Sequence, residues 1–265
     1  MAIANYGPPP DNPRLHPVAI DFYNNDLSYA QDDTIETDYG AHNIRVYRNR
    51  CYNTHTGLSA QPLYGGPVYF IRNELYAVTS LAFKLHNYCS GIEAYHNTVA
   101  TANCGFLSFN RWQNGHFRNN LILGGRNFTR PDGRERIAYA VNTGTISEYS
   151  TLDYNGYRRN ISGDMIRWYD GRELLTYPSL ATFSAATGLE RHGVLVDYDM
   201  FRLAEAPAPW TTYDPDDYDL RLREGIVAVD AGVPLPNIND GFGGAAPDLG
   251  SYELGQESPD YGPRP

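Results

Sequence analysis

The stretch that decides the fold is Ile44-Arg-Val-Tyr-Arg-Asn49, because the chain repeats its pattern without gaps. Each copy begins with a β-branched residue, alternates along a short strand, and closes on an asparagine. The other clear copies are Ile20-Asp-Phe-Tyr-Asn-Asn25, Val68-Tyr-Phe-Ile-Arg-Asn73 and Ile92-Glu-Ala-Tyr-His-Asn97, so the closing asparagines are 24 residues apart. A fifth, looser copy closes on Asn119, and Leu152-Asp-Tyr-Asn155 has the form of a sixth.

A period of this length, made of short strands and turns, is what one coil of a parallel β-helix requires. A single coil cannot bury its apolar face, so coils stack about 4.8 Å apart and equivalent residues fall into columns. We therefore predict an all-β chain, a right-handed parallel β-helix of about six coils with a C-terminal cap. The closing asparagines are predicted to form one column whose amides link coil to coil, namely Asn25, Asn49, Asn73, Asn97 and Asn119.

The regularity of the repeat also suggests how the chain is divided. We expect an N-terminal extension at 1–17, coils at 18–160, a last coil with a short helix and the cap at 161–254, and a disordered tail at 255–265. A glycine- and arginine-rich insertion interrupts the coils at about 124–147. Long loops in solenoids often border a binding face, which is the role expected of this insertion.

No helix is visible before the first coil that would cap it. Free strand edges are normally covered or paired, so we expect a homo-oligomer through that end or a missing N-terminal segment.

The composition narrows the range of partners. With 31 acidic against 21 basic residues, the chain carries a formal net charge of −10, which argues against nucleic acid or an anionic membrane surface. No apolar run approaches the length of a spanning helix, and no signal peptide is visible. Localisation stays open, and would be extracellular or periplasmic if a signal peptide has been removed. Three cysteines without CxxC spacing support neither a disulfide framework nor a zinc site.

The coils and their asparagine column resemble the pectate-lyase-like superfamily of right-handed parallel β-helices. The ending, from Val229-Asp-Ala-Gly232 through Asp240-Gly241 to Pro247-Asp-Leu-Gly-Ser-Tyr-Glu253, is similar to the close of uncharacterised bacterial, planctomycete-like β-helix proteins. The resemblance covers roughly 18–254 at the level of architecture. It implies a polysaccharide or oligosaccharide partner, bound in a groove on one outer sheet.

A second strand repeats between the asparagines and supplies the candidate binding face. Strand alternation sends Ile35, Leu58, Leu81 and Phe106 inward. The residues that alternate with these then face solvent on four successive coils. They include Glu36, Asp38, Gln61, Lys84, His86 and Arg111. Tyr64 and Trp112 lie just beyond the strands, where aromatic rings could stack on sugars.

The function we expect is β-elimination on a uronic-acid-containing polysaccharide, with Lys84, His86 and Arg111 as the catalytic group. Lys84 would be the base, its pKa lowered by the nearby His86 and Arg111, and Arg111 would hold the substrate carboxylate. Some alginate- and pectin-type lyases of this fold pair a lysine and an arginine on neighbouring coils, and the arrangement here is similar. Glu36 and Asp38, together with Gln61, could hold Ca²⁺, an ion that prefers oxygen ligands.

Two alternatives remain open. In an inverting glycoside hydrolase, Glu36 and Asp38 would be the carboxylate pair, since alternate residues of a strand have Cα atoms about 6.6 Å apart. In a non-catalytic glycan-binding or structural solenoid, the same side chains would form a solvated polar face.

Overall fold

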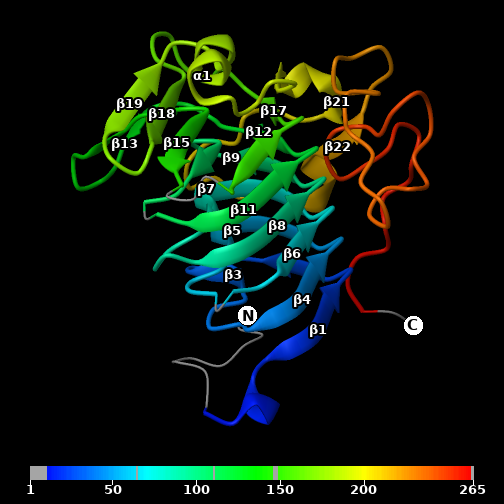
Figure 1. The fold of residues 1–265 in the computed structure, drawn as a ribbon. Helices are drawn as coiled ribbons and strands as arrows, with labels where there is room; N and C mark the ends of the chain where they lie inside the picture. Colours follow the sequence, from blue (N-terminus) through cyan, green and yellow to red (C-terminus); the bar gives the residue numbers. More distant parts are fainter. Residues whose placement is uncertain (1–10, 64, 110, 146–148, 264–265) are drawn as a thin grey trace.

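The computed structural model describes residues 11–63, 65–109, 111–145 and 149–263. This part of the chain is nearly all β and contains a single α-helix, α1 (Leu180–Thr187) (Figure 1). Its strands run parallel from coil to coil and stack as a β-solenoid, which confirms the predicted fold class. The right-handed sense of the winding and the C-terminal cap stay predictions.

Three parallel sheets form the walls of the solenoid. We call them the front, ladder and cleft sheets. The front sheet contains β1 (Val18–Tyr23), β4 (His42–Tyr47), β6 (Val68–Ile71), β8 (Ser90–Tyr95), β11 (Gln113–Arg118) and β16 (Thr151–Asp153). The ladder sheet contains β2 (Asp26–Ser28), β5 (Arg50–Ser59), β7 (Glu74–Lys84), β9 (Thr98–Thr101), β12 (Leu121–Leu123), β17 (Gly156–Tyr157) and β20 (Val194–Leu195). β3 (Asp33–Glu36) pairs with the far end of β5.

The cleft sheet continues the stack in the upper coils. It contains β10 (Phe106–Leu107), β15 (Val141–Gly144), β18 (Ile166–Tyr169) and the antiparallel β19 (Leu174–Tyr177). Two small antiparallel pairs lie outside the walls. One is the hairpin of β13 (Phe128–Thr129) and β14 (Glu135–Arg136), and the other joins β21 (Phe201–Leu203) to β22 (Asp219–Leu222). Short 3-10 turns occupy Pro13–Leu15, Tyr198–Met200 and Pro215–Asp217.

The predicted asparagine column is present. The Nδ2 of each asparagine donates to the Oδ1 of the asparagine one coil on, over 2.9 Å from Asn25 to Asn49 and 3.0 Å for each of the next two steps, to Asn73 and Asn97. Each Nδ2 beyond Asn25 also donates to a carbonyl of the preceding coil, such as the bond from Asn49 to Phe22. The column therefore ties neighbouring coils together while it satisfies buried polar groups.

The fifth member of the column is Asn120 and not Asn119, so that part of the prediction was wrong. Asn97 donates to Asn120, and Asn120 donates to Asn155. Asn119 has a φ of +58°, and the residue before each column asparagine has a positive φ in the same way, as Arg48 does at +52°. The bend thus needs a left-handed residue followed by the column asparagine, and Asn119 fills the first of these two positions because asparagine tolerates that conformation.

The column ends on a buried carboxyl group. Glu190, in the loop after α1, accepts from Asn155 Nδ2 at 2.7 Å and from Tyr157 Oη at 2.8 Å. Burial raises the pKa of Glu190 to about 8, although the bonds from Asn155 and Tyr157 act in the opposite direction.

The two largest hydrophobic clusters of the described residues lie on opposite sides of the ladder sheet. One fills the inside of the solenoid with residues such as Ile44, Val68 and Phe83. The other lies on the outer side of the ladder sheet, where C-terminal residues such as Phe201 and Leu220 pack.

The C-terminal segment, residues 196–263, therefore runs along the outside of the solenoid, as the orange and red trace of Figure 1 shows. It reaches the first coil, where Gly262 N donates to Asn24 O at 2.9 Å. The tail that the sequence analysis expects to be disordered thus makes specific contacts, among them the 2.8 Å bond between the hydroxyls of Tyr252 and Tyr261.

At the other end, β1 pairs with β4 alone among the described residues. Ile20 and Phe22 on this strand are partly buried against the core. Residues 1–10 of the predicted N-terminal extension lie outside the described part of the chain. Association through this end stays a prediction.

Candidate functional site

The strands that were predicted to carry the binding face form one outer side of the solenoid, built from β3 and the far ends of β5 and β7 below and from the cleft sheet above. We call this side the site wall, and its register differs from the expectation. Glu36 lies beside Ser59, and Ser59 lies beside Lys84, on β3, β5 and β7. When the repeats of the sequence are aligned without gaps, Gln61 is the residue expected beside Lys84, but Ser59 occupies that position. The difference arises because β7 contains an irregularity that shifts its pairing with β5 between Thr54 and Thr56. Such a bulge adds a residue to one strand and cannot be seen in a gapless alignment.

The lower half of this wall contains an acidic cluster beside Lys84, the one lysine in the sequence. The carboxylate oxygens of Asp32, Asp33 and Glu36 lie within 4.8 Å of one another. Lys84 Nζ lies 2.6 Å from Asp33 Oδ2 and 4.0 Å from Asp32 Oδ1. The ammonium group of Lys84 therefore lies where a metal cation bound by these carboxylates would lie.

Lys84 was chosen as a base because its pKa was expected to be lowered by nearby positive charge, and its pairing with Asp33 has the opposite effect. Burial alone would lower the pKa of Lys84, but the hydrogen bond and charge of Asp33, with the charges of Asp32 and Asp38, raise it. The lysine side chain is only 15% exposed, and Asp33 has no exposed side-chain surface. Lys84 is therefore held as a cation in a buried ion pair, and does not stand in an open groove.

Asp38 is separate from the group that could hold a metal. Its Oδ1 accepts from Ser59 Oγ at 2.6 Å and from the Gln61 backbone N–H at 2.9 Å. Burial raises its pKa to about 6, against the lowering effect of the Ser59 bond. Of the two residues proposed as calcium ligands and as a hydrolytic pair, only Glu36 joins the acidic cluster, while Asp38 is buried and is bonded to Ser59 and Gln61 of the next coil.

His86 lies at the boundary between the two halves of the wall. Its ring is 6.2 Å from that of Phe109 on the next coil. Burial and the charge of Lys84 lower its pKa, so the imidazole is neutral near pH 7. Its Nε2 is buried and has no hydrogen-bond partner in the described part of the chain.

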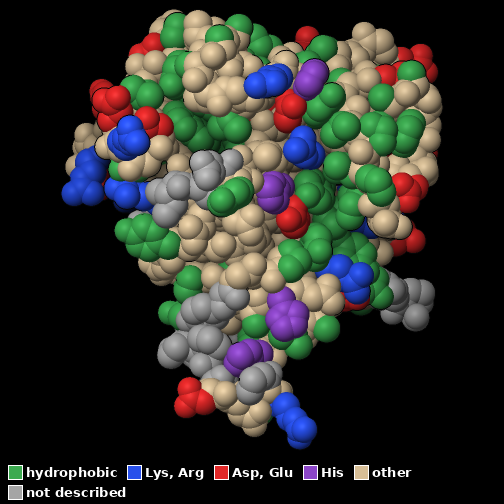
Figure 2. Space-filling model, in the orientation of Figure 1, with side chains coloured by type: hydrophobic (Ala, Val, Ile, Leu, Met, Phe, Trp, Pro, Cys, Tyr) green, Lys and Arg blue, Asp and Glu red, His purple; other side chains and the backbone are tan. Residues whose placement is uncertain are grey.

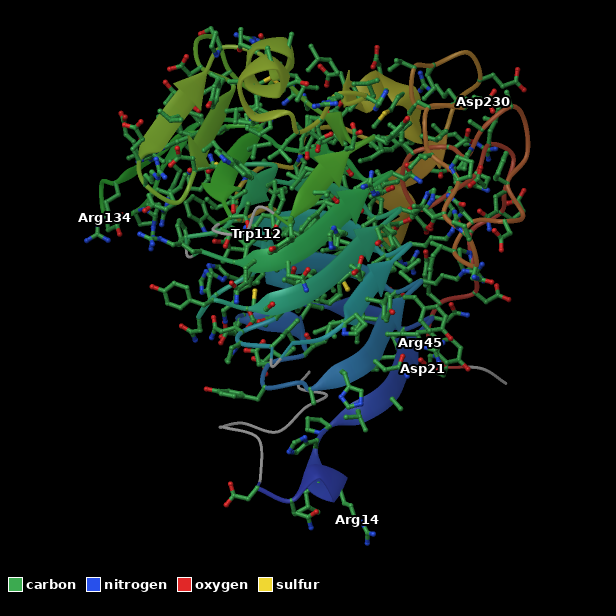
Figure 3. The ribbon with its side chains drawn as sticks, viewed as in Figure 1. Arg14, Asp21, Arg45, Trp112, Arg134 and Asp230 are labelled. Atoms are coloured by element: carbon green, nitrogen blue, oxygen red, sulfur yellow. The ribbon has the colours of Figure 1, made fainter. Side chains whose placement is uncertain are left out.

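One of the two predicted aromatic residues, Trp112, does not offer a stacking surface. Trp112 has no exposed surface, because its indole packs among Phe106 and Phe117 inside the solenoid (Figure 3). Its Nε1 donates to Thr143 Oγ1 at 2.9 Å, which satisfies the one polar atom of the ring. The prediction that Trp112 stacks on a sugar was therefore wrong. Tyr64 lies outside the described residues.

The upper half of the wall forms a cleft of about 450 Å³, which we call the arginine cleft. Its floor is the outer face of the cleft sheet, where Leu107, Asn142 and Arg167 lie in register on β10, β15 and β18. The hairpin of β13 and β14 forms one side. The insertion therefore lies beside this cleft, and that the cleft is a binding face stays a prediction. Figure 2 shows basic side chains over this hairpin, and in Figure 3 Arg134 projects from the hairpin away from the solenoid.

Three guanidinium groups, those of Arg111, Arg136 and Arg167, line the arginine cleft. Arg111 lies over the Tyr169 ring at 4.4 Å from its centroid, and Arg136 lies 5.9 Å from that of Phe109. Within the described residues none of the three pairs with a carboxylate, and Glu135 is the only acidic residue in the lining. A cluster of unpaired cations is unexpected in a chain of net charge −10. It favours an anionic ligand.

Arg111 was predicted from the sequence, whereas Arg136 and Arg167 were not. Arg167 is the outward residue of Ile166-Arg-Trp-Tyr169, a strand with the same alternation as the copies before the insertion. Extending the outward phase past the insertion would have found it. Nothing in the sequence shows that the hairpin folds Arg136 over the same sheet.

The fold and this wall define the chain as a parallel β-solenoid with a basic cleft on one outer sheet. No protein-family model matches the sequence, and neither the curated proteins nor the solved structures contain a significant match to it. The described residues include no helix long and apolar enough to span a membrane.

Proposed function

We propose that this protein binds an acidic polysaccharide or oligosaccharide, one that carries carboxylates, in the arginine cleft. The observation that supports this most directly is the group of three unpaired guanidinium side chains around one cavity. Guanidinium groups bind carboxylates with two parallel hydrogen bonds, and exposed rings such as Phe109 offer apolar contact to a sugar. The resemblance to the pectate-lyase-like superfamily accords with a ligand of this class.

The reaction we propose is β-elimination at a uronate residue. An arginine that neutralises the carboxylate makes the proton on the adjacent carbon easier to remove. His86 is neutral near pH 7 and lies next to Phe109 at the edge of the cleft, so it replaces Lys84 as the proposed base. The proton passes to His86, the glycosidic carbon–oxygen bond breaks as a carbon–carbon double bond forms, and the departing oxygen takes a proton from solvent.

Hydrolysis with paired carboxylates has less support. It needs two carboxyl groups on either side of the scissile bond. Among the described residues, Glu135 is the one acidic residue in the lining of the arginine cleft. The acidic pair predicted from the sequence lies in the other half of the wall, and Asp38 there is only 4% exposed.

A second candidate is binding without catalysis. The observation in its favour is that Lys84 is bound to Asp33, which leaves the arginine cleft without a lysine base. In that case the cleft would hold an acidic glycan and the chain would cleave nothing.

One experiment separates these possibilities. The purified protein is mixed with polygalacturonate, alginate and neutral glucans, and three quantities are followed: binding, reducing ends, and the ultraviolet absorbance of unsaturated uronate. We expect binding of the acidic polymers with a rise in absorbance. Reducing ends without absorbance would indicate hydrolysis, and binding alone would indicate a non-catalytic protein. Failure to bind any acidic polymer would refute the proposal.

A further inference from the structure

A second pocket lies on a different wall of the solenoid, between the ladder sheet and the C-terminal segment. It has a volume of about 490 Å³, within the range of sites for small ligands. Arg50 at the start of β5 and Glu74 at the start of β7 form its inner side. Tyr218, Tyr252 and Tyr261 from the C-terminal segment also line it, so we call it the tyrosine pocket.

Tyr218 is the first sign that the tyrosine pocket is built for a ligand. The residue is only 5% exposed, and its ring stacks on that of Tyr76 with 4.1 Å between centroids. Its hydroxyl is buried and has no hydrogen-bond partner in the described part of the chain. A buried hydroxyl without a partner costs stability, and this one belongs to a residue that lines a cavity, so a ligand in the cavity would explain why it is retained.

Glu74 is the second sign. Its carboxyl group is 4% exposed and accepts a hydrogen bond from Tyr252 Oη, which in turn lies 2.8 Å from Tyr261 Oη. Burial raises the pKa of Glu74 to about 7, against the opposing effects of the Tyr252 bond and of the Arg50 charge. The wall of the pocket thus presents a carboxyl group and several phenol hydroxyls, all of which can exchange hydrogen bonds.

The charges around the tyrosine pocket select an uncharged ligand. Arg50 forms two hydrogen bonds with Asp26, at 2.9 and 2.6 Å, and its guanidinium lies 4.9 Å from the centre of the Tyr261 ring. Arg221 is paired with Asp219 at 2.8 Å. The position that a cationic ligand would take over the Tyr261 ring is therefore already filled by Arg50. The lining as a whole is balanced in charge, with three acidic residues, Glu74, Asp216 and Asp219, against three arginines, Arg50, Arg202 and Arg221, so it has no net charge to attract an anion.

We propose that the tyrosine pocket binds an uncharged saccharide of one or two sugar residues, with Tyr218 Oη and the Glu74 carboxyl group as hydrogen-bonding partners. Sugar hydroxyls both donate and accept, which matches these two groups, and the tyrosine rings offer apolar contact to the sugar ring. The site is separate from the arginine cleft and its ligand differs in charge, so it does not depend on the function proposed above.

The test uses the full chain and the methyl glycosides of glucose, galactose and mannose, together with maltose and cellobiose. Saturation-transfer NMR detects binding, and calorimetry measures the affinity. Tyr218→Phe removes one hydroxyl and keeps the ring stack on Tyr76, so we expect affinity to fall about three- to tenfold. Glu74→Gln is expected to reduce it as well. Tyr88→Phe is the matched control, because Tyr88 is 61% exposed and lies outside the pocket.

Thermal unfolding distinguishes a ligand-binding hydroxyl from a purely structural one. Without sugar, Tyr218→Phe should melt at the same temperature as the wild type or higher, because it removes a buried polar atom that has no partner. Lower affinity in a variant that is at least as stable would support the proposal. Absence of binding to all of these sugars would overturn it, as would a Tyr218→Phe variant with unchanged affinity. Binding of acidic polymers should be unaffected in either case.

Discussion

The two halves of the site wall differ in how their charged side chains are paired. In the lower half, around β3 and β7, Lys84 lies at the acidic cluster of Asp32, Asp33 and Glu36, and its ammonium group pairs with the buried carboxylate of Asp33. In the upper half, Arg111, Arg136 and Arg167 share a cavity and have no carboxylate partner among the described residues. The wall is continuous and both halves are polar. Charge that is paired internally serves the fold, whereas charge left unpaired in a cavity is free to bind a ligand.

The largest effect we expect comes from the paired half. Lys84→Ala should lower the free energy of unfolding by about 3–5 kcal/mol, because it leaves the buried Asp33 carboxylate without its cation. Lys84→Arg should retain much of the stability, since it keeps the charge. Urea denaturation measures both. Arg45→Ala is the control, because the pair it breaks with Asp21 is exposed and should contribute at most about 1 kcal/mol. Figure 3 shows this pair on the front sheet. Equal losses in Lys84→Ala and Arg45→Ala would contradict the assignment.

The next effect concerns the unpaired half. Arg167→Ala should weaken the binding of oligogalacturonate about 10- to 100-fold, as expected for the loss of a charged hydrogen bond of about 1.5–3 kcal/mol. The affinity of Arg167→Lys should lie between those of the wild type and Arg167→Ala, because lysine keeps the charge and loses the bidentate hydrogen bond. Calorimetry at low salt measures this, with Arg45→Ala again as the control. If Arg167→Ala binds as tightly as the wild type, the cleft is not the site.

A smaller effect is the dependence of stability on pH in the paired half. The pKa of Asp38 is about 6 in the folded protein and 3.8 for an unperturbed aspartate, so the folded state holds the proton more tightly. The free energy of unfolding should therefore fall as pH rises through this window, by at most about 3 kcal/mol from this group. Asp38→Asn should remove that part of the slope. Urea midpoints of the two proteins between pH 4 and pH 7 check this, and parallel curves would show that Asp38 does not titrate as stated.

The smallest effect expected is that of calcium on the wild type. Lys84 Nζ lies among the acidic side chains, so added CaCl2 should not raise the melting temperature measurably. Lys84→Gln removes the competing cation while keeping a polar side chain, and in this variant calcium should raise the melting temperature. A clear rise in the wild type would mean that the acidic cluster binds calcium despite the lysine.

The sequence was sufficient to predict the fold because the repeat acts in every coil. Four asparagines at a constant spacing gave the column, and the structure shows Asn25, Asn49, Asn73 and Asn97 bonded in that order. The spacing alone could not choose between Asn119 and Asn120, because that choice depends on which residue adopts the left-handed conformation at the bend.

The site was predicted only in part, since it depends on contacts between distant segments. Strand alternation correctly placed Arg111 on the outer wall, but it could not show that Lys84 meets Asp33, a residue 51 positions earlier. Nor could it show that the indole of Trp112 turns into the core. Such outcomes are decided by bulges and loop conformations, which the period of the sequence does not encode.

The path of the C-terminal segment has a consequence for how this protein acquires its structure. Solenoids usually fold and fray from coil to coil, because each coil contacts only its neighbours. Here Gly262 bonds to Asn24, and the Asn53 side chain exchanges two hydrogen bonds with the backbone of Tyr213, so the first coils depend on residues synthesised last. During translation the outer side of the early coils therefore stays uncovered until the C-terminal segment has been synthesised. Such long-range contacts slow folding, and they should also make the finished molecule unfold in one cooperative step.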